Sequence, residues 1–291
     1  MPAPTFRAAG TSAAGTSGAV SPGIPAGVVA GDLLFLCAEG SNTDFGTDPT
    51  GYTPLYEGSG VSSKLKVWTR IASGTGADAA TITPTAGDHT YARIYAWQDP
   101  NVAVPCVILG SSEFPGAGAV TGCTIPGGQC LFDDCAYFGI GAYTADTADL
   151  ATSAQSNADV TGLTDQGHLG TALGNGGGLV VYSGSITAGK VRSTTFTAGT
   201  ATGITGLALA LPPKAAIALS SKSVTIAGVA APDGGNVRFL DLTQPAASCL
   251  VGVVTTAAGV YSALVPYDDH NYQAVFENGA NYGASSVHLA V

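Results

Sequence analysis

The chain has 291 residues, of which 45% are apolar and only 10% are charged, with 41 glycines and 16 prolines. This length supplies apolar side chains for more than one hydrophobic core, and the scarcity of Glu, Lys and Arg disfavours long exposed helices. The net charge of −10 repels a phosphate backbone, so nucleic acid is not expected as a partner.

Short segments in which apolar and polar residues alternate recur along the first 213 residues, between turns rich in Gly, Pro, Asn and Asp. Alternation with a period of two predicts β-strands that bury one side. A short helix fits only residues 145–160. A dozen strands exceed what one flat sheet carries, so the pattern predicts an all-β fold that begins with a large, jelly-roll-like β-sandwich. The expected strands are 5–12, 31–39, 52–58, 64–71, 78–85, 91–97, 104–113, 134–144, 168–173, 178–187, 193–199 and 205–211.

The expected strand over 64–71 has two faces of different character. One face carries Leu65, Val67 and Ile71, whereas the other carries two lysines and Arg70. We therefore expect the first face to lie in the core and the second to lie in solvent.

The expected strand over 91–97 gathers large rings on one face. Tyr91, Tyr95 and Trp97 share that face with Arg93. We expect the three rings to contact a loop, a neighbouring subunit or, by stacking on sugar rings, a host glycan. The alternative is that they fill the core of the sandwich.

Residues 113–129 are apolar and poor in charge, and they begin with Glu113, Phe114 and Pro115. Exposing such a segment to water does not stabilise a monomer. We therefore expect it to contact a neighbouring subunit, with Phe114 and Pro115 at the interface. A strand with a wide turn inside the sandwich is the alternative.

The alternation stops at Leu211-Pro212-Pro213-Lys214, because proline cannot join a strand ladder. This predicts a first domain over 1–213, a linker over 214–223 and a second domain over 224–291. The size of the second domain predicts a small Ig-like β-sandwich. Its expected strands are 224–230, 236–242, 249–255, 260–265, 272–277 and 286–291.

No stretch of the sequence carries a recognised catalytic arrangement. Neither a Gly-x-Ser-x-Gly elbow nor a phosphate-binding Gly-x-x-x-x-Gly-Lys occurs, and the four histidines lie far apart. The pair Asp88-His89 follows a turn signal, where Asp caps backbone amides. We therefore expect no enzymatic activity, no cofactor and no metal ion.

Two features keep other chemistry open. The six cysteines match neither a C-x-x-C motif nor a zinc pattern, so we expect buried thiols, with a disulfide or a metal site as alternatives. Asn42, Asp44 and Asp48 share one polar loop, and their side-chain oxygen atoms are suitable ligands for calcium. The alternative is an ordinary solvated loop that binds no ion.

The longest apolar runs, such as 33–38 and 207–213, are far shorter than the roughly 20 residues that cross a bilayer. We therefore expect no membrane partner. The first seven residues hold one base and no apolar segment follows them, which is atypical of a secretory signal, so we expect synthesis in a cytoplasm.

An Ala-Gly-Thr-Ser segment is followed in order by Ile24–Leu34, Pro49–Leu55, Leu65–Ala72 and Ala92–Trp97. Over about residues 5–100, this series resembles a recurring module of bacteriophage virion proteins. Such proteins are tail, fibre or head-surface components. The resemblance implies a structural role and brings no active site.

A second series comprises Ala231–Gly235, Val237–Phe239, Thr255–Tyr261 and Val265-Pro266. It resembles the prealbumin-like or carboxypeptidase-regulatory type of immunoglobulin-like domain. Such modules are common additions to phage surface proteins and bacterial adhesins, and again no active site follows.

The two resemblances imply a virion structural protein. Our first hypothesis is a capsid decoration or head-spike protein that attaches to the major capsid protein as a homotrimer. The alternative is a tail or tail-fibre component that contacts other tail proteins and binds a host surface glycan. A bacterial adhesin or carbohydrate-binding module is a weaker alternative.

Overall fold

The computed structural model describes residues 3–41, 44–60, 63–101, 105–112, 120–130, 132 and 134–213, together with four strands of the C-terminal part. The chain divides into two compact units, Met1–Lys214 and Ala215–Val291. The predicted linker over 214–223 lies outside the described residues. No helix in the described part is long and apolar enough to span a membrane.

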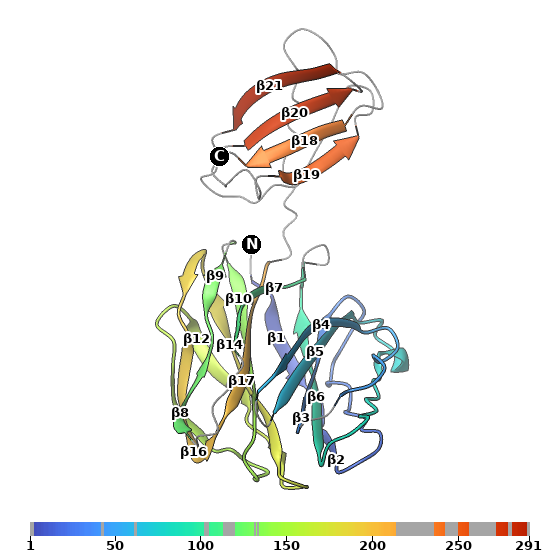
Figure 1. The fold of residues 1–291 in the computed structure, drawn as a ribbon, viewed down its shortest axis with the longest axis vertical. Helices are drawn as coiled ribbons and strands as arrows, with labels where there is room; N and C mark the ends of the chain where they lie inside the picture. Colours follow the sequence, from blue (N-terminus) through green and yellow to red (C-terminus); the bar gives the residue numbers. More distant parts are fainter. Residues whose placement is uncertain are drawn as a thin grey trace. The chain divides into compact units, whose positions relative to one another are not determined.

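The first unit contains two large antiparallel sheets that face each other (Figure 1). The first sheet has the order β1-β6-β3-β5-β4, with β2 paired to β6, and the second has the order β12-β14-β10-β17-β7, with β13 paired to β14. Strands of the first sheet are β1 (Thr5–Ala9), β2 (Ala13–Gly15), β3 (Leu33–Gly40), β4 (Thr53–Ser59), β5 (Lys64–Ile71) and β6 (Thr90–Gln98). Strands of the second are β7 (Val107–Ser112), β10 (Cys135–Tyr143), β12 (Thr161–Gly167), β13 (Gly170–Thr171), β14 (Gly177–Ile186) and β17 (Ile204–Leu211).

Two smaller sheets accompany the second sheet. The third sheet has the order β11-β16-β8, and the fourth pairs β15 with β9. Their strands are β8 (Val120–Ile125), β9 (Gly128–Cys130), β11 (Thr152–Ser156), β15 (Gly189–Val191) and β16 (Thr194–Thr202).

The central strands β3, β10 and β17 are buried along their whole length. In β3 this follows from an unbroken apolar run, Leu33–Ala38, which offers apolar side chains to both faces. One face of the first sheet packs on the second sheet, and its other face packs under loops. The outer face of the second sheet packs on the third sheet. The all-β sandwich predicted from the sequence is confirmed.

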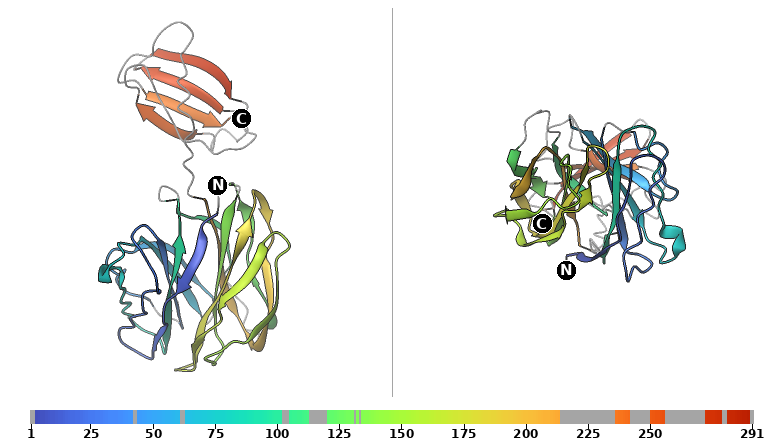
Figure 2. Two further views of the ribbon diagram at one scale, coloured as in Figure 1. Left: turned by 180° about the vertical axis from the view of Figure 1, so that it is seen from behind. Right: turned by 90° about the horizontal axis from the view of Figure 1, so that it is seen from below.

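The two facing sheets are built from successive halves of the unit. Strands β1 to β6 all belong to the first sheet, and the strands of the second sheet follow after residue 98. The colours therefore separate in Figure 2, with blue to teal on one side and green to orange on the other. The sequence pattern predicted a jelly-roll-like closure but carried no information on this division.

The four longer outer strands of the two facing sheets each contain a register shift. One extra residue bulges from β1 between Phe6 and Ala8, one from β4 between Pro54 and Tyr56, and one from β7 opposite Ala208 and Leu209. Strand β12 shifts twice. A bulge bends the outer strand and disturbs its free row of backbone groups.

Two predicted elements of the first unit are wrong. Residues 78–85 form no strand: a capping box of Thr75 and Asp78 starts the short 3₁₀ helix η1 (Gly76–Asp78), and Ile82 pairs with Val20 in an isolated bridge. Residues 145–160 form no helix. They contain strand β11, and positive φ angles at Ala151 before it and at Ala154 within it interrupt any helical turn.

The second unit contains one described antiparallel sheet with the order β19-β18-β20-β21. Three of its strands coincide with predicted ones, and the last begins five residues earlier than predicted. The predicted strands 224–230 and 260–265 lie outside the described residues. The strands are β18 (Asn236–Asp241), β19 (Leu250–Thr255), β20 (Tyr272–Asn278) and β21 (Asn281–Leu289).

Candidate functional site

The aromatic rings predicted as a contact surface lie in the core of the first unit. Tyr91 and Trp97 are each 1% exposed and Tyr95 is fully buried. Tyr95 and Trp97 pack edge-on against Phe138 of the second sheet, at ring-centre distances of 5.7 and 5.4 Å. The prediction of a glycan or subunit contact at these rings is therefore corrected to the alternative interpretation, because the second sheet covers this face of β6.

The other predicted contact residues, Phe114 and Pro115, lie outside the described residues. Strand β7 ends before these two residues, and strand β8 begins after them. The subunit interface predicted there stays a prediction.

The charged face of β5 is covered by acidic side chains rather than by solvent. Lys64 lies 2.6 Å from Asp44 and from Glu57, and Lys66 lies 3.1 Å from Asp48 and from Glu57. Hydrogen bonds from Lys64 to Asp44 and Glu57, and from the Trp68 indole and then Lys66 to Asp48, hold the pKa values of these three carboxyl groups below their usual range. The sequence missed this cover because the acidic partners come from a distant loop and from the neighbouring strand.

The same loop was the alternative calcium site. Asp48 accepts a hydrogen bond of 2.7 Å from the indole N–H of Trp68 as well as the lysine contact, so its carboxylate serves the first sheet. Asn42 lies outside the described residues. Within the described part of the chain, no three His, Cys, Asp or Glu side chains form a metal-binding group.

A buried acid–histidine cluster lies at one end of the two facing sheets. His89 is 2% exposed and Glu39 is fully buried. The Nε2 atom of His89 lies 3.1 Å from Oε2 of Glu39, and its Nδ1 atom lies 2.7 Å from Oδ1 of Asp88. The sequence predicted only a turn cap at Asp88, since nothing marks Glu39 as its neighbour 50 positions earlier.

The electrostatics of this cluster favour bound protons. Burial raises the pKa of Glu39 from 4.5 to about 7, although the hydrogen bond and charge of His89 act in the opposite direction. For His89, burial lowers the pKa, but hydrogen bonds to Glu39 and then Asp88 outweigh burial and raise it. The pair thus retains protons above the ordinary range of a carboxyl group.

A second histidine lies in a partly exposed cluster. His168 contacts Asp165 through Nδ1 at 2.7 Å and Asp149 through Nε2 at 3.4 Å. In a nucleophile–base pair, one ring nitrogen instead accepts a hydrogen bond from a hydroxyl or thiol. At both His89 and His168 the two ring nitrogens face carboxylates, which is an arrangement that orders loops.

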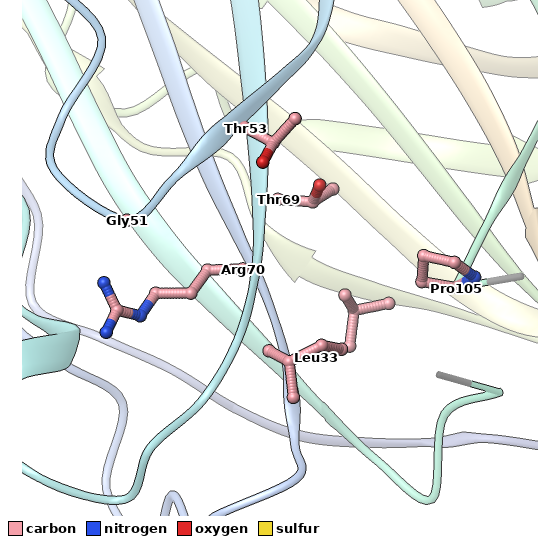
Figure 3. Close-up of a pocket in the computed structure, with 7 residues that line it drawn as sticks. Leu33, Gly51, Thr53, Thr69, Arg70 and Pro105 are labelled. Atoms are coloured by element: carbon pink, nitrogen blue, oxygen red, sulfur yellow. The ribbon is translucent and has the colours of Figure 1, made fainter. Parts of the chain in front are cut away.

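A surface hollow of about 420 Å³ lies where the ends of β4 and β5 approach Pro105 (Figure 3). Thr53 and Thr69 are cross-strand partners on its wall. Figure 3 shows the guanidinium group of Arg70 pointing away from these threonines, and it donates a hydrogen bond of 3.0 Å to Asp78. The hollow therefore presents hydroxyl and apolar groups. The lining residues are Leu33, Gly51, Thr53, Thr69, Arg70, Ile71 and Pro105.

A second hollow, of about 450 Å³, is more polar and includes Asp134, Asp159, Thr161 and Ser185. Asp159 is engaged by Arg192, which donates to it from both its side chain at 3.1 Å and its backbone at 2.7 Å. Both hollows offer a concave surface for contact with another molecule.

Comparisons with protein families, with curated proteins and with solved structures find no match for this chain.

Proposed function

We propose that the chain is a structural protein of a bacteriophage particle, and specifically a capsid decoration or head-spike protein. The main support for the proposal is the position of the phage-like series in the fold. Residues 5–100, which resemble a virion module, build the whole of the first sheet, since its six strands run from residue 5 to residue 98. The resemblance thus follows one complete structural layer rather than scattered segments.

The chemistry of the described residues supports a structural role. The lysines of β5 pair with carboxylates of the same unit, and so does the buried His89. Packed layers with internally paired charges make a rigid body that needs no cofactor to hold its shape. On a symmetric shell, many copies of such a body add weak individual contacts into firm attachment, and a trimer fits sites of threefold symmetry.

The test uses phage particles purified from a lysate of the cells that produce the chain. We expect mass spectrometry to find the chain at tens to hundreds of copies per particle, and a gold label on its C-terminus to decorate the head. Particles that lack the gene product should recover the label when purified protein is added at micromolar concentration. Absence of the chain from purified particles would overturn the proposal.

The same label tests the tail alternative. Label confined to the tail or its fibres would replace a head location with a tail component. The specific support for glycan binding is gone, because the rings of Tyr91, Tyr95 and Trp97 are buried. A tail location would therefore call for a glycan site elsewhere on the chain.

A further inference from the structure

Two cysteines of the first unit hydrogen-bond to one and the same backbone oxygen. The thiols of Cys130 and Cys135 donate to the carbonyl oxygen of Phe132 over 3.2 and 3.3 Å. The two sulfur atoms therefore lie at most 6.5 Å apart, which is the sum of the two distances. Closing the remaining gap to a bonded S–S separation of about 2.05 Å calls for rotation of the two side chains.

The backbone on both sides of this pair is held by the same hairpin. Cys130 ends β9 and lies opposite Gly189, whereas Cys135 begins β10 and lies opposite Ile186. Both side chains are buried in the core between the second and third sheets, Cys130 at 1% and Cys135 at 0% exposure. The fold thus fixes the two cysteines close together at the point where the chain passes from the fourth sheet into the second.

We propose that Cys130 and Cys135 form an intramolecular disulfide when the chain folds or refolds in the presence of a small-molecule disulfide oxidant such as oxidised glutathione. This inference is independent of the proposed function. The remaining described cysteines provide an internal comparison: Cys37 and Cys106 pack in the core between the two facing sheets, and the thiol of Cys123 lies 3.9 Å from the carbonyl oxygen of Thr121.

The reaction balances as two thiol–disulfide exchanges. One protein thiolate attacks a sulfur of oxidised glutathione and expels a glutathione thiolate, which forms a mixed disulfide. The second protein thiolate attacks the protein sulfur of that mixed disulfide and expels the second glutathione thiolate. Each expelled thiolate takes up the proton that its attacker released, so two protein thiols are oxidised and one glutathione disulfide is reduced to two thiols.

The test uses the full-length chain, because both sulfurs are buried in the folded state. The reduced chain is unfolded in urea and refolded in a mixture of reduced and oxidised glutathione, remaining thiols are alkylated, and the chain is cleaved before Asp without reduction. Cleavage separates a peptide of residues 99–132 from one of residues 134–145, since Asp99, Asp133, Asp134 and Asp146 are cleavage points. We expect these two peptides to be joined, and fragmentation to place the bond at Cys130.

Variants and a titration sharpen the result. The linked peptides should persist in Cys123→Ser and Cys106→Ser and disappear in Cys130→Ser. The equilibrium constant for oxidation by glutathione should be at least about tenfold higher under folding conditions than in urea. Alkylated Cys135 in the refolded wild-type chain, or a bond placed at Cys106 or Cys123, would overturn the proposal even if a serine variant fails to fold.

Discussion

The Nε2 atom of His89 lies 3.1 Å from Oε2 of Glu39, with both side chains almost completely removed from solvent. The backbone of Gly177, from the opposite sheet, closes over this pair, since a Cβ atom there would lie 2.6 Å from each of the two atoms. A charged pair at this depth is costly unless each group finds its partner. The contact therefore lies at one end of the first sheet, and Gly177 of β14 in the second sheet packs directly against it.

The first prediction concerns the dependence of stability on pH. Because the folded-state pKa of Glu39 is raised from 4.5 to about 7, the folded chain binds this proton more tightly than the unfolded chain does. The resulting stabilisation is present below pH 4.5 and is lost as the pH rises through 7, by up to about 3 kcal/mol. Urea unfolding of the wild type should show this decline, and Glu39→Gln should flatten it.

Glu57→Gln is the matched control for that experiment. The pKa of Glu57 is lowered by its lysine partners, so its contribution is present above pH 4.5 and is lost only at lower pH. The slope between pH 4.5 and 7 should therefore survive in this variant. Equal slopes in the wild type and Glu39→Gln would refute the assignment to Glu39.

The second prediction tests the close approach of β14 to the acid–histidine pair. Gly177→Ala should lower the free energy of unfolding by about 1–3 kcal/mol, because the new methyl group forces the two sheets or the buried side chains apart. Gly122→Ala, in strand β8, is the control, since nothing lies within 4 Å of a Cβ at that position. Chemical denaturation of both variants measures the difference, and similar effects at the two positions would count against the close approach.

The third prediction concerns the ring at the centre of the sandwich. Phe138 contacts Phe35, Tyr95 and Trp97 across the two facing sheets. Phe138→Ala should cost about 3–5 kcal/mol, because it removes a fully buried ring and leaves a cavity. Leu173→Ala, at a side chain that is 43% exposed, should change stability by less than about 0.5 kcal/mol.

The fourth prediction follows from the two tryptophans of the chain, Trp68 and Trp97, which are both buried. Their fluorescence should be blue-shifted in the folded state, weakly quenched by iodide and unchanged by added sugars. Unfolding in urea should shift the emission to the red and restore quenching. Strong iodide quenching of the folded chain would contradict the burial of the rings.

The fifth prediction concerns the carboxylate that serves both Trp68 and Lys66. Asp48→Ala should destabilise the fold by about 1–3 kcal/mol, because it leaves the buried indole N–H without its acceptor. Asp44→Ala removes the ion pair of a largely exposed carboxylate with Lys64 and should have a smaller effect. Thermal unfolding of the two variants should separate them, and equal shifts in midpoint would argue against the role of the indole bond.

Alternation in the sequence predicted most strands of the first sheet because each strand is a local pattern. It did not predict which face would be covered. The face of β6 that carries Tyr95 and Trp97 is buried because the second sheet lies over it, and Lys66 of β5 is covered in part because Asp48 returns to it from 18 positions earlier. These burial patterns depend on pairing between segments that are distant in the sequence, and local periodicity does not predict such pairing.

The acid–histidine pair was beyond prediction for the same reason. Asp88-His89 is readable as a turn, but Glu39 becomes its neighbour only through the pairing of β3 with β6, which sets Gly40 opposite Thr90. The failed strand over 78–85 has a different cause. There a capping box of Thr75 and Asp78 places the first residue of the segment in a short helix, and Ile82 pairs with Val20 in an isolated bridge instead of a ladder.

The bulges in β1, β4, β7 and β12 bear on how copies of this chain behave when they are crowded. A straight outer strand has unpaired backbone groups that can hydrogen-bond to a strand of a neighbouring copy. Repeated pairing of this kind produces fibrils. With these four longer outer strands bent, high local density favours association through side chains, which is specific in geometry and reversible. Copies that are packed closely together can thus each keep their own fold without pairing their outer strands.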